Sequence, residues 1–77
     1  MIGPIEISPG ITVDNDVHHG KAVIRGTRVP VSLVLGQLAA GVSYVELEEE
    51  FGVTVEGIRA ALRYASELVS HETVRAG

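Results

Sequence analysis

Apolar and polar residues alternate with a period of two in the first part of the chain, which predicts β-strands. Two such segments, Ile5–Ile7 and Ile11–Asp14, stand on either side of the turn sequence Ser8-Pro9-Gly10. A loop over residues 15–20 separates them from further apolar segments. The first third of the chain is therefore expected to form a short β segment.

A β-hairpin is predicted directly after this loop. Lys21–Arg25 and Arg28–Val31 have the composition of strands and flank the dipeptide Gly26-Thr27. A glycine followed by another residue fits a two-residue type II′ turn, because glycine takes the positive φ at the first central position. Pro30 cannot donate a ladder hydrogen bond, so its strand should lie at an edge of the sheet.

This register has a consequence for two charged side chains. If Gly26-Thr27 is the loop, Arg25 and Arg28 face each other across the strand pair, and like charges in that position repel. A phosphate or carboxylate held by both guanidiniums, the Thr27 hydroxyl and the turn amides would relieve the repulsion. Alternatively, the arginines splay into solvent or pair with glutamates of the same or a neighbouring chain.

From residue 32 onward apolar residues recur every three or four positions, which predicts helices. Ser32 is expected to cap the first helix, and Gly41 stands where a left-handed residue ends one. Ser43 and Glu46 have the spacing of a capping box that opens a second helix, which Gly52 ends.

Thr54 is expected to cap a third helix, the longest of the three. The spacing of apolar residues also indicates which side of each helix faces the core. The apolar positions of the three helices are Leu33, Val34, Leu35, Leu38 and Ala39, then Val45, Leu47 and Phe51, then Val55, Ile58, Ala61, Leu62, Ala65, Leu68 and Val69.

The second and third helices are joined by Phe51–Thr54, whose length and glycine match the tight turn of a helix-turn-helix. In that motif the second helix of the pair enters the major groove of DNA. Arg59 and Arg63 then lie one turn apart on its outward face and could contact phosphates or guanine edges. Thr54 and the helix N-terminal amides could hold a further phosphate. The other residues expected to face outward are Glu56, Gly57, Ala60 and Glu67.

Charges are segregated along the chain, although the net charge is −4. The stretch between Val17 and Val45 holds three basic and no acidic residues, and acidic residues follow at positions 46, 48, 49, 50 and 56. A negative net charge disfavours nonspecific nucleic-acid binding, which basic residues carry. The glutamates either form the solvated face of the second helix or oppose DNA there, in which case a DNA complex must tilt this helix away.

Length and composition limit the possible classes of protein. The 77 residues form one domain, with a β segment at 1–31, a helical part at 32–70 and a tail at 71–77. A hydrophobic share of 45% is high for so small a domain and favours a homodimer. The sequence shows no membrane span and no signal-peptide pattern, so we expect a cytoplasmic protein without membrane contact.

The residues that carry chemistry do not assemble into a reaction centre. There is no cysteine, which excludes disulfides and cysteine-based zinc sites. His18 and His19 lie near Asp14 and Asp16, but adjacent side chains on a strand point in opposite directions, so we expect no metal. No nucleophile, base and orienting group can be matched, and we therefore predict a protein that is not an enzyme and binds no cofactor.

The segment Gly20–Val31, together with Ala39–Ser43 and Ile58–Ala65, resembles domain-of-unknown-function family 433. The similarity extends from about Ile11 to Leu68. This resemblance implies a small homeodomain-like helix-turn-helix protein with an N-terminal β segment, usually dimeric. It also implies an antitoxin of the VapB type, paired with a PIN-like toxin nuclease and repressing its own operon.

Together these observations predict an α+β fold, with a short β segment and hairpin followed by a three-helix, helix-turn-helix bundle. The expected function is that of a DNA-binding transcriptional regulator, the antitoxin of a type II toxin–antitoxin module. The alternative is a protein–protein interaction module that binds a partner without recognising DNA. The residues expected to contact operator DNA are Arg25, Thr27, Arg28, Thr54, Arg59 and Arg63.

Overall fold

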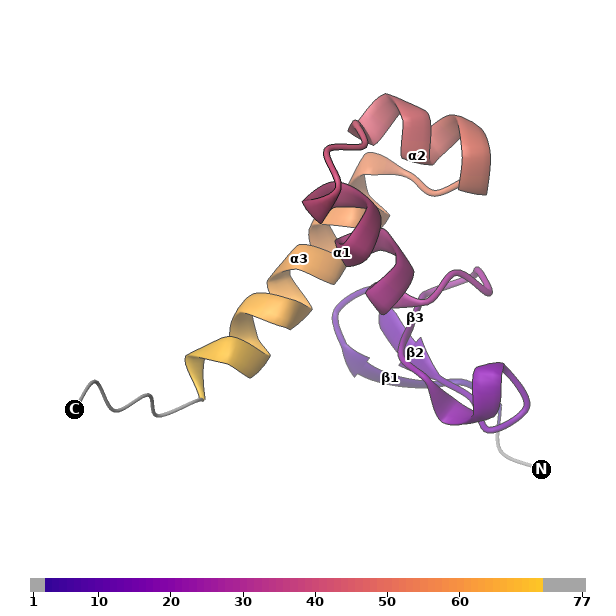
Figure 1. The fold of residues 1–77 in the computed structure, drawn as a ribbon. Coiled ribbons are helices and arrows are strands. Elements are labelled where there is room, and N and C mark those ends of the chain that lie inside the picture. The colour runs from indigo at the N-terminus through magenta and orange to yellow at the C-terminus, as the bar shows by residue number, and fades with distance from the viewer. Residues whose placement is uncertain (1–2, 72–77) are drawn as a thin grey trace.

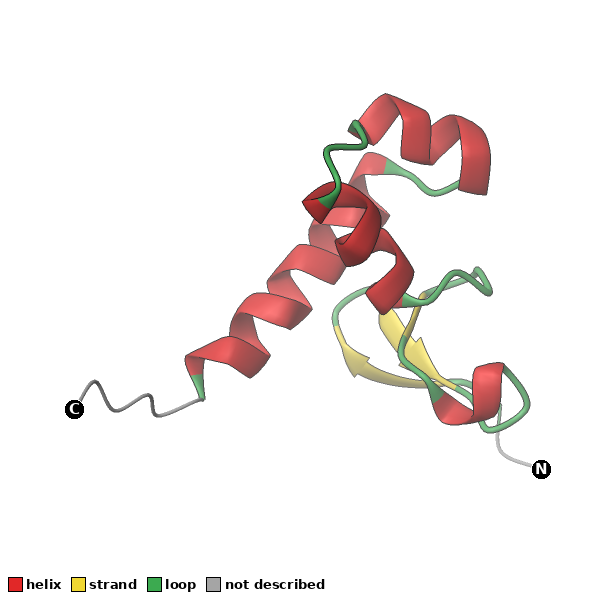
Figure 2. Ribbon diagram, in the orientation of Figure 1, coloured by secondary structure: helices red, strands yellow, loops and turns green. Residues whose placement is uncertain are grey.

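A computed structural model describes residues 3–71 of the chain. A three-stranded antiparallel sheet comes first and three helices follow, so the predicted α+β fold is confirmed (Figure 1). Figure 2 shows the strands gathered at one end of the molecule and the helices extending from it. The elements are β1 (Ile5–Ser8), β2 (Ile11–Val13), the short 3-10 turn η1 (His18–Gly20), β3 (Val23–Ile24), α1 (Val31–Ala39), α2 (Tyr44–Phe51) and α3 (Val55–Ser70).

The sheet has the strand order β1-β2-β3, with β2 at its centre. β1 and β2 form the antiparallel pair that the alternating pattern predicted, and its register shifts between Glu6 and Ser8. β3 pairs with β2 through Ile24 and Ile11, a pairing that the local pattern did not reveal. Because β2 is central and the helices cover the sheet, Ile11 is fully buried.

The turn after β3 differs from the predicted hairpin loop. Its closing hydrogen bond runs from the Thr27 N–H to the Ile24 carbonyl (3.0 Å), so Arg25 and Gly26 are the central residues. Gly26 has a φ of 77°, which suits the second central position of a type II turn rather than the first of a type II′ turn. The predicted two-residue loop was therefore wrong, and the regular ladder stops at Ile24.

α1 begins one residue earlier than predicted. Its N-cap is Pro30, whose carbonyl accepts hydrogen bonds from the N–H groups of Leu33 and Val34 (3.1 and 3.3 Å). Ser32, the expected cap, is an exposed residue of the first turn, because the fixed φ of Pro30 already directs the chain into the helix. The predicted end is confirmed, since Gly41 is left-handed with a φ of 92°.

The predicted caps of the other two helices are confirmed. The Ser43 hydroxyl accepts from the Glu46 N–H (3.1 Å), and the Glu46 carboxylate accepts from the Ser43 N–H (3.2 Å). α2 ends at Gly52, whose φ of 70° carries no steric cost for a residue without Cβ. Thr54 then accepts the Gly57 N–H (3.0 Å) and opens α3. A three-residue turn thus separates α2 from α3, as in a helix-turn-helix.

The core lies where the sheet, α1, α2 and the first half of α3 meet. Leu47, with Tyr44 and Phe51 one turn away on either side, defines the inward face of α2. Val45 lies on the other side of that helix and is 60% exposed, so the expectation that it is buried was wrong. The buried hydrophobic residues are Ile11, Val23, Ile24, Val31, Val34, Leu47, Val53, Ile58, Ala60 and Ala61.

The second half of α3 extends past the other helices (Figure 1). Leu62, Leu68 and Val69 were expected to be buried, but they are 38%, 54% and 62% exposed. The prediction was wrong here because the apolar spacing continues beyond the point where α1 and α2 cover the helix. Apart from His71, the tail predicted at 71–77 lies outside the described residues.

None of the helices within residues 3–71 combines the length and the apolar character needed to cross a bilayer.

Candidate nucleic-acid interface

The outward face of α3 carries two arginines one turn apart. Ile58 and Ala61 are fully buried, which fixes the rotation of the helix about its axis. Arg59 and Arg63 therefore point to the far side, and both are exposed as predicted. Within residues 3–71 neither forms an ion pair with a carboxylate. Both guanidiniums are thus free to contact phosphates or guanine edges.

One flank of this helix is closed by the sheet. Gly57 and Ala60 were expected to face outward, but both are buried. A Cβ on Gly57 would lie 2.9 Å from Cγ2 of Ile24, and a Cβ on Gly10 would lie 2.8 Å from Cβ of Ala60. The small residues at these positions therefore let α3 rest directly on β3 and on the β1–β2 turn. This contact narrows the open face of α3 to the stripe that contains the two arginines.

Thr54 is occupied in part by its capping role. Its hydroxyl oxygen accepts the Gly57 N–H, which removes one of the free amides from the start of α3. The residue is exposed, so its own hydroxyl proton remains able to donate to a phosphate. The site predicted at this helix N-terminus is therefore present with one amide fewer.

Arg25 lies at the edge of the covered flank. Its backbone N–H donates to the Gly10 carbonyl (2.8 Å), and its Nη1 donates to Oε1 of Glu6 (3.2 Å). The two side chains are 68% and 43% exposed, so solvent screens the ion pair and it stabilises the fold by only about 0–1 kcal/mol. Together with Thr54 and Glu56, Arg25 lines a groove of about 310 Å³ beside the start of α3.

Glu6 was not anticipated as part of this site. It lies 19 positions before Arg25 and approaches it because β1 and β3 are on the same sheet. The alternation of Ile5, Glu6 and Ile7 indicates a polar face of β1. The strand order, which brings that face to Arg25, has no local signal.

The tip of the turn does not form the predicted anion site. Oγ1 of Thr27 donates to the Ile24 carbonyl (2.7 Å) and accepts the Val29 N–H (3.0 Å). These two bonds hold the turn closed and use the hydroxyl that was expected to meet an anion. Thr27 is therefore a structural residue of the turn.

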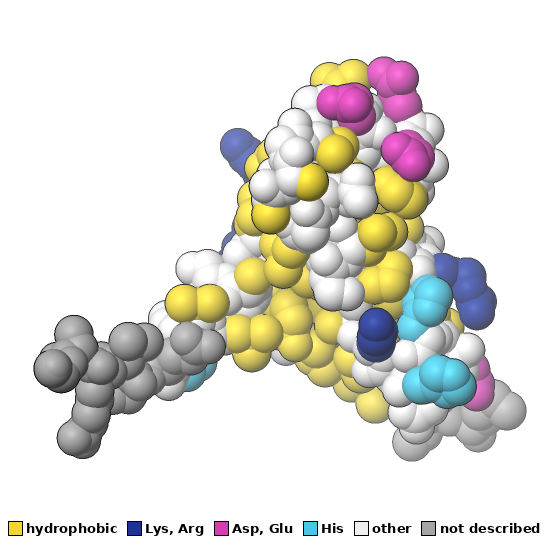
Figure 3. Space-filling model, viewed as in Figure 1, with side chains coloured by type: hydrophobic (Ala, Val, Ile, Leu, Met, Phe, Trp, Pro, Cys, Tyr) yellow, Lys and Arg dark blue, Asp and Glu magenta, His cyan; other side chains and the backbone are white. Residues whose placement is uncertain are grey.

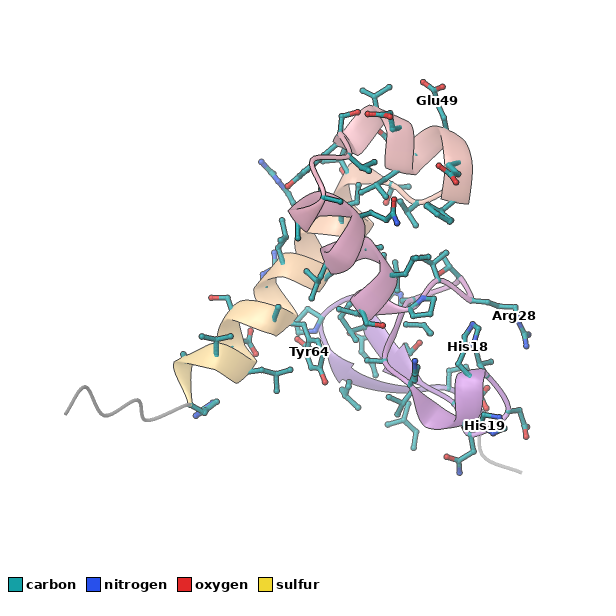
Figure 4. All side chains as sticks on the ribbon, in the orientation of Figure 1. His18, His19, Arg28, Glu49 and Tyr64 are labelled. Carbon is teal, nitrogen blue, oxygen red and sulfur yellow. The ribbon has the colours of Figure 1, made fainter. Side chains whose placement is uncertain are left out.

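The two arginines of this turn have different neighbours. Arg25 pairs with Glu6, which is the intramolecular alternative left open by the sequence. Arg28 projects beside His18 (Figure 4), whose Nε2 donates to the Arg28 carbonyl oxygen (2.7 Å). The expected cross-strand pair of arginines was wrong because the ladder ends before both residues. Arg28 is consequently not part of the surface formed by α3.

The loop before β3 holds two histidines in a rare backbone conformation. His18 and His19 have φ values of 51° and 56°, in the left-handed region that non-glycine residues seldom adopt. Their side chains project near Arg28 at one edge of the molecule (Figure 4). Within the described part of the chain, no three His, Asp or Glu side chains gather as metal ligands would.

α2 carries the main negative surface of the molecule. Figure 3 shows acidic side chains gathered at the end of the molecule opposite the sheet, and Glu49 points away from the body in Figure 4. Of the glutamates of α2, those at 46, 49 and 50 are exposed and Glu48 is half-buried. Phosphates would be repelled there, so any DNA must approach α3 from the side away from α2.

These features define a small α+β protein in which a three-stranded sheet supports a helix-turn-helix. The family described as "Protein of unknown function (DUF433)" matches residues 11–65, which is more than half of the chain, and the chain belongs to this family. The matched segment runs from β2 through most of α3, so it includes every element that positions Arg25, Arg59 and Arg63. No curated protein and no solved structure matches the chain.

Proposed function

We propose that this protein is a DNA-binding transcriptional regulator of the antitoxin type, with α3 as its recognition helix. The observation that carries the proposal is the pair Arg59 and Arg63, which are exposed, one turn apart and not paired with carboxylates of residues 3–71. They follow a capped three-residue turn that holds α3 against α2. Arginine is the side chain best suited to guanine O6 and N7 and to phosphate oxygens.

The covered flank limits how α3 meets DNA. Because the sheet buries Gly57 and Ala60, the helix cannot present its full width to a major groove. Base contacts then come from Arg59 and Arg63, and Arg25 contributes a phosphate contact from the edge of the sheet. With so few basic contacts, the affinity should depend less steeply on salt than that of a strongly basic protein.

The partners of this regulator follow from the family resemblance and from the small size of the chain. We propose that it acts in the cytoplasm as a homodimer on its own operator and pairs with a PIN-like toxin. Its small domain and its exposed Leu62, Leu68 and Val69 support self-association.

A gel-shift titration with the DNA upstream of the gene tests the DNA-binding proposal. The unmutated protein should form a complex that weakens with salt, and Arg59→Ala combined with Arg63→Ala should reduce the affinity at least about 100-fold. Arg28→Ala removes a charge of the same kind from a surface away from α3, so it is the matched control and should change the affinity little. The absence of a salt-sensitive complex with the unmutated protein would contradict the proposal.

A protein–protein interaction module is the second candidate function. The observation that favours it is the surface of α2, where Val45 is exposed among the glutamates at 46, 49 and 50. Such a surface fits a basic protein partner better than it fits DNA. Under this function, the toxin encoded beside the gene should bind the Arg59→Ala, Arg63→Ala double variant as tightly as it binds the unmutated protein, and no operator complex should form.

A further inference from the structure

The apolar seam of α3 continues beyond the part of the helix that the rest of the chain covers. Ile58, Ala61, Ala65 and Leu68 are spaced by three, four and three residues, which is the repeat of helix–helix seams. The first two are fully buried by the other elements, whereas Ala65 is half-buried and Leu68 is 54% exposed. The same helix face therefore serves the core in its first half and is open in its second half.

A groove lies beside this open half. It has a volume of about 350 Å³ and is apolar, with Lys21 as its one charged lining residue among residues 3–71. Figure 4 shows Tyr64 in the angle between α3 and the sheet, and Figure 3 shows hydrophobic side chains gathered over this angle. The apolar residues that line the groove are Ala22, Val31, Leu35, Tyr64, Ala65 and Leu68.

The charged residues of α3 lie on another side of the helix. On a helical projection, Arg59 and Arg63 fall about 120–160° away from Ala65, at 100° per residue. Glu67 falls about 160° away on the same basis. A helix laid over Ala65 would thus meet apolar side chains on both chains and no like charges. It would also leave the two arginines uncovered.

We infer that the occupant of this surface is a second copy of the chain, whose α3 packs antiparallel against α3 with a twofold axis at Ala65. The ridge formed by Leu68 and Val69 and the groove beside it are on the same molecule, so each copy offers the other what it needs. The small side chain of Ala65 allows the two helices to approach closely at the axis. This register places Leu68 of one copy opposite Leu62 of the other, which covers two side chains that a monomer leaves exposed.

The inference deepens the proposed homodimer and rests on it, but it does not depend on DNA binding. The seam and the arginine stripe occupy different sides of α3, so either can be disrupted without the other. The experiments below therefore use no DNA, and operator binding is measured separately.

Sedimentation equilibrium of the full chain measures the oligomeric state directly. The unmutated protein should be a dimer, and Leu68→Glu should weaken dimerisation at least tenfold. Val45→Glu is the matched control, because Val45 is equally exposed, at 60% against 54%, and lies on α2. It should remain a dimer. Both variants place a charge at an exposed position, so the circular dichroism of each should match that of the unmutated protein.

Cysteine cross-linking tests where the seam lies. The chain contains no cysteine, so a single introduced thiol reports one position. Under mild oxidation Ala65→Cys should form a disulfide-linked dimer in high yield, because a twofold axis at this residue brings the two Cβ atoms to about 4 Å. Ser66→Cys, an exposed neighbour that faces about 100° away, should not.

The outcomes separate the two ideas. A monomeric unmutated protein would overturn both the seam and the proposed homodimer, and it would leave operator binding to be judged by the gel shift. A dimer that persists in Leu68→Glu, or that cross-links no better through Ala65→Cys than through Ser66→Cys, would overturn the seam while self-association stands.

Discussion

The N-terminal half of α3 lies between the sheet and the other two helices, whereas its C-terminal half runs past them (Figure 1). Both halves carry the same spacing of apolar residues, yet Ile58 and Ala61 are fully buried while Leu68 and Val69 are more than half exposed. The comparison shows that the apolar spacing fixes which side of a helix avoids water. What covers that side is decided by elements far away in the sequence.

The largest expected difference between the two halves concerns folding stability. Ile58→Ala should lower the free energy of unfolding by about 2–5 kcal/mol, because it leaves a cavity at a fully buried site in the first half. A urea titration followed by circular dichroism measures this loss. In so small a domain a loss of this size is enough to leave much of the protein unfolded.

Leu68→Ala is the matched change in the second half. It should cost less, and its effect should grow with protein concentration, because Leu68 contributes to association rather than to the core of one chain. Equal, concentration-independent losses for Ile58→Ala and Leu68→Ala would mean that the two halves do not differ as described.

A second prediction concerns the contact that covers the first half. Gly57→Ala should lower the free energy of unfolding by about 1 kcal/mol, because crowding Cγ2 of Ile24 at 2.9 Å outweighs the gain in helix propensity. Gly36→Ala is the control, since it is an exposed glycine of α1 with no atom within 4 Å of the added Cβ. It should raise stability by up to about 1 kcal/mol, as helix propensity alone predicts. Thermal and urea unfolding of both variants measure the difference in sign, and a stabilising Gly57→Ala would show that the sheet does not press on α3.

The difference between the halves also explains how far the sequence could be interpreted. The caps at Ser43 and Thr54 and the helix end at Gly52 were predicted because each depends on residues three or four positions apart. The burial of Gly57 and Ala60 was missed because it depends on β3 pairing with β2 and on both meeting a helix some thirty positions later.

The candidate interface follows the same rule. Arg59 and Arg63 were placed on the outward face of α3 from the helical repeat alone, and the structure leaves both exposed. The neighbours of Arg25 were predicted wrongly, because a single shift in the turn moved its partner from Arg28 to Glu6. Local spacing predicts the direction of a side chain on a helix, but charge partners across a sheet require the strand order.

The smallest expected effect tests Arg25, the one candidate contact that belongs to the covered side. Glu6→Gln removes the carboxylate that accepts from Nη1 of Arg25, so the guanidinium should become free for a phosphate beside the start of α3. The operator affinity should rise about two- to threefold, consistent with the small value of an exposed ion pair, and the salt slope should steepen by about one unit. Glu49→Gln on α2 makes the same change in net charge without touching Arg25 and is the control. A gel-shift series at several salt concentrations measures both quantities. If the two variants raise the affinity equally, the gain comes from net charge alone, and Arg25 takes no part in the interface.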